Sequence, residues 1–139
     1  MRILFLCTGN SCRSQMAEGW GHKLLAGRAE VFSAGSKPGV VDPRAIKVMA
    51  EAGVDISGHR SKHSDEFKGQ AFDLVVTVCD QARESCPLWL GPSEKLHKSF
   101  EDPPFLARDA KTEEEALAPY RRVRDEIKVF VGGLLEGIK

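Results

Sequence analysis

The 139-residue sequence has no net charge and no long apolar run. Lysine and arginine together number 20, and so do aspartate and glutamate, so the overall charge gives no indication of binding to nucleic acid or an anionic membrane. The apolar run at residues 2–6 stops shortly before Gly9 and Asn10 and is too short for a signal peptide or a membrane span. We therefore expect a cytoplasmic protein that binds neither nucleic acid nor a membrane.

Cysteine is also scarce, with four residues in the chain. Without an export signal, a structural disulfide framework is not expected, because cytosolic thiols are kept reduced. Zinc sites usually contain more closely spaced cysteine and histidine pairs than Cys7 with Cys12 or Cys79 with Cys86. The histidines, which show no ligand spacing, are His22, His59, His63 and His97. We therefore predict no metal site and no bound cofactor, and we favour thiol chemistry.

The hydrophobic pattern alternates between strands and helices. Residues 2–6 and 72–78 are nearly continuous apolar runs, which suit strands buried on both faces of a parallel sheet. Further strands are expected at residues 29–34 and 96–100, and helices at 14–26, 43–52 and from about 113 onward. Asp42 and Pro43 are typical of a helix N-terminus. No repeat, linker or low-complexity stretch interrupts the chain.

This order of elements predicts one α/β domain over residues 1–139, with a doubly wound sheet. In such folds ligands bind beyond the carboxyl ends of the strands. Cys7, Cys79 and Asp102 each follow a predicted strand closely. We therefore expect these three side chains to converge on one crevice.

The stretch at residues 7–14, Cys-Thr-Gly-Asn-Ser-Cys-Arg-Ser, lies between a predicted strand and a predicted helix. Backbone N–H groups in such a loop form a nest for a tetrahedral anion, and the same field favours a cysteine thiolate. Arg13 offers a planar fork of donors for two anion oxygens, which lysine does not reproduce. The predicted anion-binding residues, around the nucleophile Cys7, are Thr8, Gly9, Asn10, Ser11, Cys12, Arg13 and Ser14.

Two further side chains support this interpretation. We expect Ser14 to hydrogen-bond the Cys7 sulfur and Asn10 to adopt a left-handed or Asx-type turn. The alternative is that Cys7 is a buried cysteine at a strand end and Arg13 a surface residue. A Cys-x5-Arg match is only moderately specific, but its place between an apolar strand and an amphipathic helix favours the functional interpretation. The sequence therefore predicts an enzyme whose Cys7 attacks a phosphate-like oxyanion.

Residues 7–20 resemble the corresponding segment of the low-molecular-weight tyrosine phosphatase superfamily and, within it, of the thioredoxin-coupled arsenate reductases. Similar segments lie at residues 32–35, 55–57, 73–77 and 122–128, so the resemblance covers nearly the whole chain. It implies a three-layer α/β fold with a four-stranded parallel sheet flanked by helices.

The second cysteine pair separates the two subfamilies. A phosphatase needs a nucleophile, an arginine and an acid, whereas a reductase also needs thiols that carry two electrons away. The resemblance implies that Cys7 attacks arsenate and that Cys79 then attacks the Cys7 adduct, releasing arsenite and leaving a Cys7–Cys79 disulfide. Cys86 next attacks Cys79, and thioredoxin, the expected electron donor, reduces the Cys79–Cys86 disulfide. Phosphate and sulfate are expected to compete with arsenate, and the protein is expected to be a monomer.

Asp102, before Pro103, holds the position of the family's general acid, which protonates a departing oxygen. An ordinary Asp-Pro turn is the alternative. The phosphatases usually follow Asp-Pro with tyrosine, whereas this chain has Pro104 and Phe105, which favours the reductase. A hydrolytic phosphatase that uses Cys7, Arg13 and Asp102, or a phospho-ligand binding module without catalysis, remains an alternative.

Two further expectations come from the resemblance. Cys12 has the position of a second cysteine that can protect the phosphatase nucleophile through a disulfide, and we expect a structural rather than a catalytic role for it here. Some reductases of this type hold a monovalent cation through residues that align with Asn10, Glu18, Ser33, Arg60 and Lys62. The last two are basic in this chain, so we expect no bound potassium and predict that the Lys62 ammonium takes the place of the cation.

Overall fold

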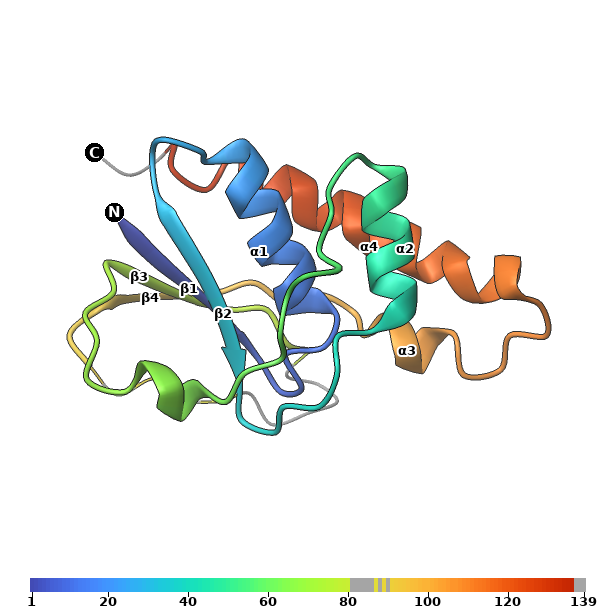
Figure 1. Cartoon of the computed structure of the whole chain (residues 1–139), viewed down its shortest axis with the longest axis horizontal. Helices are drawn as coiled ribbons and strands as arrows, with labels where there is room; N and C mark the ends of the chain where they lie inside the picture. The colour runs from blue at the N-terminus through green and yellow to red at the C-terminus, as the bar shows by residue number, and fades with distance from the viewer. Residues whose placement is uncertain (81–86, 88, 90, 137–139) are drawn as a thin grey trace.

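A computed structural model describes residues 1–80, 87, 89 and 91–136, and its centre is a sheet of parallel strands (Figure 1). The strands are β1 (Arg2–Cys7), β2 (Glu30–Gly35), β3 (Leu74–Thr77) and β4 (Glu94–His97). Their order in the sheet is β2-β1-β3-β4, and every pairing is parallel. The predicted four-stranded parallel sheet is thus confirmed.

The strand positions follow the hydrophobic pattern where the strands are buried. β1 is central, and its residues from Ile3 to Cys7 are all buried, as its apolar run predicts. β4 is an edge strand whose four residues are exposed, and it begins before the predicted residues 96–100. Because only Leu96 is apolar in β4, the sequence carries little signal for its position.

The helices are α1 (Arg13–Leu24), α2 (Pro43–Glu51), α3 (Pro103–Leu106) and α4 (Glu113–Gly132), with a 3-10 turn η1 (Ser64–Phe67). Asp42 caps α2 as predicted, because its carboxylate accepts a hydrogen bond from the Arg44 N–H. The sequence predicts only a break at the Asp-Pro-Pro segment, where the structure forms the short helix α3. No helix in the part of the chain described here has both the length and the hydrophobicity that a membrane span requires.

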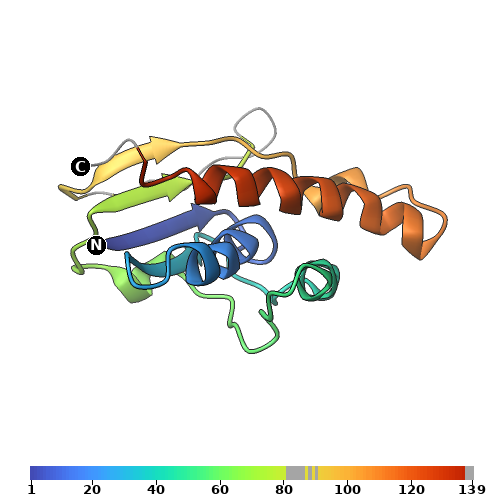
Figure 2. The same cartoon turned by 90° about the horizontal axis from the view of Figure 1, so that it is seen from above.

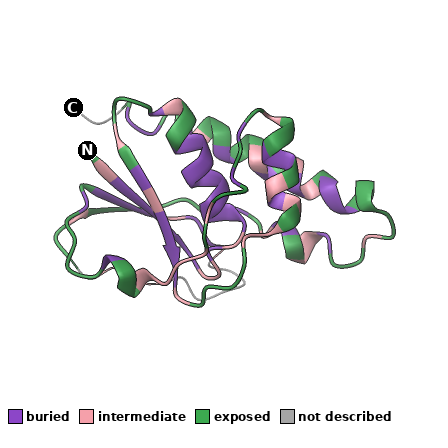
Figure 3. Ribbon diagram, in the orientation of Figure 1, coloured by how far each residue is buried: buried purple, intermediate pink, exposed green. Residues whose placement is uncertain are grey.

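The helices lie mainly on one face of the sheet (Figures 1 and 2). α1 packs on β1 and β2, α4 packs beside α1, and α2 packs on α4. The larger core lies between this layer and the sheet and includes Ile3, Phe5 and Trp20. The opposite face of the sheet buries Leu4 and Leu6 under η1 and neighbouring aromatic side chains. Burial is therefore continuous along the inner strands and along α1 from Arg13 to Gly21 (Figure 3).

The carboxyl ends of the strands share one edge of the sheet because all pairings are parallel. β1 ends at Cys7, directly opposite Gly35 at the end of β2. The Val78 N–H donates to the Leu6 carbonyl at 2.9 Å, which places the next residue, Cys79, at the same edge. Cys7 and Cys79 therefore reach the same edge of the sheet because of the register of β1 with its two neighbours, although only Cys7 and Asp102 of the three predicted residues line the pocket described below.

Candidate active site

The loop that joins β1 to α1 forms one side of a pocket at the carboxyl edge of the sheet. The pocket has a volume of about 390 Å³. It is lined by Cys7, Thr8, Gly9, Ser11, Cys12, Arg13, Asp102, Pro104 and Phe105. The predicted nucleophile, arginine and acid therefore share one pocket, although Asp102 comes from the start of α3.

Asn10 fixes the shape of this loop from the buried side. Its φ of 47° is left-handed, a conformation that asparagine tolerates better than most residues. Its amide nitrogen donates to Ser14 Oγ at 2.8 Å and to Ser33 Oγ at 2.9 Å, and its Oδ1 accepts from the Lys62 backbone N–H at 2.8 Å. Asn10 and Ser14 are both fully buried. Their side chains therefore brace the loop from behind and do not line the pocket.

The Cys7 sulfur lies 3.0 Å from Ser14 Oγ, as predicted. The same hydroxyl oxygen accepts from the Asn10 amide, so the Ser14 proton is available for a hydrogen bond to the sulfur. The thiolate is the nucleophilic form of cysteine, and Ser14 is the hydroxyl placed to donate to it. Cys7 has no disulfide and is only 2% exposed, so an oxyanion must enter the pocket to reach it.

Arg13 is held between the pocket and the end of the sheet. Its guanidinium Nη1 donates to the Phe100 carbonyl at 3.2 Å, and Nη2 lies 3.6 Å from Asp102 Oδ1. Arg13 is almost completely buried, whereas about a third of the Asp102 side chain is exposed. The guanidinium fork is thus oriented before an anion binds, and the Asp102 carboxyl can exchange protons with water.

The second cysteine pair is only partly described. Cys79 lies just beyond β3, is fully buried and is disulfide-bonded. Cys86 lies outside the described residues. The structure therefore places Cys79 at the sheet edge beside the Cys7 loop and leaves the predicted role of Cys86 as a prediction.

Cys12 differs from Cys7 in its surroundings. Burial raises its pKa well above the ordinary value, and the nearby carboxylates of Asp42 and Asp102 raise the pKa further. Cys12 therefore stays a protonated thiol at neutral pH, which makes it a poor nucleophile. This agrees with the structural role expected for Cys12, although it lines the pocket.

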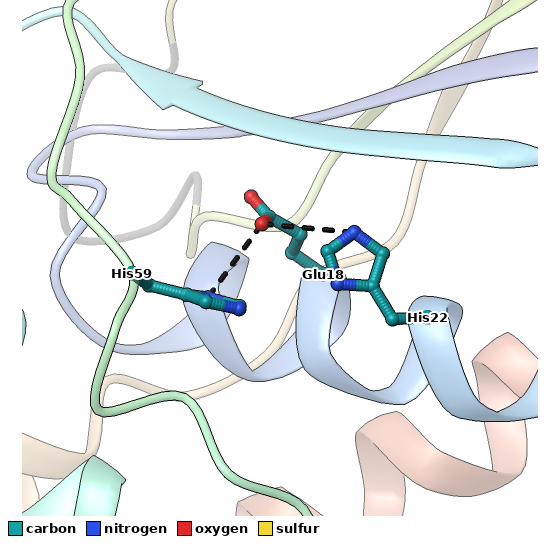
Figure 4. A group of neighbouring side chains, drawn as sticks. All are labelled: Glu18, His22 and His59. Atoms are coloured by element: carbon teal, nitrogen blue, oxygen red, sulfur yellow. Dashed lines mark ion pairs between the residues drawn. The ribbon is translucent and has the colours of Figure 1, made fainter.

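A second polar cluster lies behind the loop, and the sequence interpretation missed it. The buried Glu18 accepts from Ser33 Oγ at 2.6 Å through Oε1, which also lies 3.6 Å from Lys62 Nζ. Its Oε2 lies 3.8 Å from His22 Nε2 and 3.6 Å from His59 Nδ1 (Figure 4). Burial lowers the pKa of His59 from its ordinary value, and this outweighs the opposing effect of Glu18. Two of the histidines expected to be scattered thus converge on one carboxylate, and the four-residue spacing of Glu18 and His22 is the signal that could have shown it.

The chain is similar to one protein family in sequence and in structure. Residues 2–139 match the family model described as low molecular weight phosphotyrosine protein phosphatase. An arsenate reductase of Halalkalibacterium halodurans is 50% identical over 125 residues, which cover 90% of this chain and 88% of that protein. A solved arsenate reductase in a phosphate-binding state has a TM-score of 0.79 at 34% identity, with 99% of this chain and 98% of that chain covered. A thioredoxin-dependent arsenate reductase of Corynebacterium glutamicum has a TM-score of 0.71 at 25% identity, with 99% and 61% covered.

Proposed function

The chain belongs to the low molecular weight phosphotyrosine protein phosphatase family, and from this membership and the geometry of the site we propose that the protein is an arsenate reductase. It converts arsenate into arsenite. The observation that supports this activity best is the position of Cys79. A buried cysteine in a disulfide lies at the same sheet edge as the free thiol of Cys7, and the hydrolysis of a phosphoester does not itself require a second thiol.

The first step uses the groups around the pocket. The Cys7 thiolate attacks arsenic, so that an S–As bond forms and an As–O bond breaks. Arg13 and the backbone N–H groups of the loop hold the remaining oxygens of the anion. Asp102 donates its proton to the departing oxygen, which leaves as water. The partly exposed Asp102 carboxylate then recovers a proton from solvent.

The second step transfers the electrons. The Cys79 thiolate attacks the Cys7 sulfur, so that a Cys7–Cys79 disulfide forms and the S–As bond breaks. The electron pair of that bond stays on arsenic, which leaves as arsenite. Cys86 then attacks the Cys79 sulfur and releases Cys7 as a thiolate. Thioredoxin supplies the two electrons that reduce the Cys79–Cys86 disulfide.

The electron donor and the setting of the reaction belong to this proposal. The Corynebacterium glutamicum relative is described as thioredoxin-dependent, which supports thioredoxin as the partner here. Because thioredoxin keeps cytosolic thiols reduced, we place the protein in the cytoplasm, where it acts as a monomer. Phosphate and sulfate compete with arsenate, since the loop recognises a tetrahedral oxyanion.

Phosphomonoester hydrolysis is the second candidate activity. The arrangement of Cys7, Arg13 and Asp102 in one pocket is sufficient for it. The pocket wall, however, is made by Pro104 and Phe105, and the guanidinium of Arg108 lies 3.7 Å from the centre of the Phe105 ring. Because this cation covers one face of the ring, stacking of an aryl phosphate is restricted to the other face. We therefore propose that hydrolysis is a slow side activity.

Parallel assays on one preparation distinguish the two activities. Arsenate-dependent oxidation of NADPH is followed with thioredoxin and thioredoxin reductase, and hydrolysis of an aryl phosphate is followed separately. We expect Cys79→Ser to abolish arsenate reduction and to leave aryl phosphate hydrolysis intact. Cys7→Ser is the matched control and should abolish both. If Cys79→Ser reduced arsenate at the rate of the unmodified protein, this result would contradict the proposal.

A further inference from the structure

Three side chains with metal-binding atoms converge outside the active-site pocket. Glu18 and His22 lie one turn apart on α1, and His59 lies between α2 and η1 (Figure 4). One ligand atom from each residue lies within 4.8 Å of the others. Imidazole nitrogens with one carboxylate oxygen form a common ligand set for zinc. No other group of this kind occurs in the described part of the chain.

The distances are close to those of a filled site. Ligand atoms of a tetrahedral zinc ion lie about 3.3 Å apart, because its bonds are about 2.0 to 2.1 Å long. Glu18 Oε2 lies 3.6 Å from His59 Nδ1 and 3.8 Å from His22 Nε2, so each of these two pairs needs to close by about half an ångström or less. The ligand nitrogens of the two histidines lie within 4.8 Å of each other and have to approach more closely when an ion binds. The His22 side chain is 49% exposed and is therefore free to make this adjustment. We propose that Glu18, His22 and His59 form a binding site for a divalent transition-metal ion of the zinc class.

The charges around Glu18 leave one oxygen for the ion. Ser33 Oγ and Lys62 Nζ both lie at Oε1, whereas the two histidines face Oε2. The Lys62 ammonium disfavours a second cation at Oε1. An ion bound to Oε2 lies on the side of the two histidines, and Glu18 Oε1 then still accepts the hydrogen bond from Ser33.

The site also has space and access. His22 and His59 line a hollow of about 360 Å³ together with Gly19, Lys23, Gly53, Val54 and Asp55. The Asp55 carboxylate and the Lys23 ammonium contribute opposite charges to this wall. A tetrahedral ion with three protein ligands keeps a fourth position, which the hollow leaves open to water. The ion can enter from solvent because the hollow is at the surface beside the exposed His22.

Binding of the ion would replace two hydrogen bonds that His22 and His59 make to uncharged acceptors. His22 Nε2 lies 3.0 Å from the Val31 carbonyl, and His59 Nδ1 lies 2.9 Å from Gln15 Oε1. A neutral ring that binds the ion through this nitrogen carries its proton on the other nitrogen, so neither ring has to lose a proton. The bonds to the ion offset the two lost hydrogen bonds.

An ion at this position would tie the loop before η1 to α1. The same loop holds the back of the active site, since the Lys62 N–H donates to Asn10 Oδ1 at 2.8 Å and Ser61 Oγ donates to the Gly9 carbonyl at 3.0 Å. Ligation of His59 and Glu18 therefore stabilises the folded chain and braces the anion loop from outside.

The test is a zinc titration of the full-length chain by calorimetry, in parallel with His22→Gln and His63→Gln. His63 is the matched control, because it is a similarly exposed histidine outside the cluster, and both variants keep every cysteine. We expect His22→Gln to weaken one zinc site by more than about tenfold, since loss of outer-shell partners alone costs 10- to 100-fold. His63→Gln should bind like the unmodified chain. At the same zinc concentration, the thermal midpoint should rise more for the unmodified chain and for His63→Gln than for His22→Gln.

A second measurement on the unmodified chain keeps the result independent of folding defects in a variant. Imidazole nitrogen resonances of His22 and His59 should shift on addition of one equivalent of zinc, and those of His63 and His97 should not. Equal zinc affinity in the two variants, or resonances of His22 and His59 that stay in place, would overturn the proposal and assign any bound zinc to the thiols.

Discussion

Gly35→Ala should displace the anion loop although Gly35 touches no substrate. Gly35 is the last residue of β2, opposite Cys7 in the register of β1. A Cβ atom at this position would lie 2.5 Å from the Thr8 carbonyl oxygen and 2.8 Å from both the Asn10 nitrogen and the Cys7 carbonyl oxygen. All three atoms belong to the backbone of the loop, so no side-chain rotation relieves the overlap.

The size of the effect follows from these contacts. Ordinary carbon–oxygen contacts are about 3.3 Å or longer, so the Thr8 carbonyl must move by about 0.8 Å from the 2.5 Å position. Overpacking of this kind costs about 1 to 3 kcal/mol of folding free energy. A displacement near 1 Å of the groups that position a substrate costs roughly 100-fold in rate. A 100-fold loss corresponds to about 2.7 kcal/mol of transition-state stabilisation, so we expect losses of similar size in catalysis and in stability.

Urea denaturation measures the stability of Gly35→Ala, calorimetry measures its phosphate affinity, and an assay of arsenate-dependent turnover measures its catalysis. Gly39→Ala is the matched control, because Gly39 is exposed and a Cβ there would meet no atom within 4 Å. Gly35→Ala should lose about 1 to 3 kcal/mol of stability and most of its phosphate affinity, and Gly39→Ala should lose neither. Phosphate affinity and kcat/KM of Gly35→Ala equal to those of the control would refute the idea that close packing of β2 sets the loop geometry.

Three further predictions concern residues around the pocket. Lys62→Met should lower the free energy of unfolding by about 2 kcal/mol in urea denaturation, because the buried Glu18 carboxylate loses the ammonium group beside it. Potassium chloride should restore part of the lost stability, whereas tetramethylammonium chloride should not, and strong activation of the unmodified enzyme by potassium would contradict the prediction. Tyr120→Phe should cost about 1.5 to 3 kcal/mol in the same assay, because the hydroxyl donates to the Asp42 carboxylate at 2.6 Å, and an unchanged unfolding midpoint would count against it. Cys86→Ser should allow a single turnover in rapid-quench experiments and accumulate a disulfide between the first two thiols of the proposed relay; sustained turnover would exclude that relay.

The anion loop is the part of the site that local sequence predicts best. The strand, the loop and the helix follow from an apolar run, a Gly-Asn turn and a helical pattern that are contiguous in the chain. The left-handed conformation of Asn10 and the contact of Ser14 with Cys7 are both confirmed, because they depend on residues only a few positions apart. Local chemistry is sufficient where all partners lie in one short segment.

The parallel-sheet rule predicts that Cys7 and Asp102 share one crevice, but no local pattern encodes which individual side chains of distant segments come into contact. The pairing of Arg13 with Asp102 joins α1 to the start of α3, and the histidines converge because the loop that carries His59 folds back over α1. α3 itself is missing from the prediction, since two prolines indicate a break although the first turn of a helix accepts them. These features depend on how the chain folds back on itself.

The most direct measurement is a thiol count and disulfide map of the fully reduced protein after addition of arsenate alone, with phosphate as the control. The proposed relay predicts that arsenate removes two thiols, that they map to Cys79 and Cys86, and that thioredoxin restores them, whereas phosphate has no effect. An unchanged thiol count after arsenate, together with hydrolysis of an aryl phosphate by the same sample, would contradict the relay and identify the protein as a phosphatase.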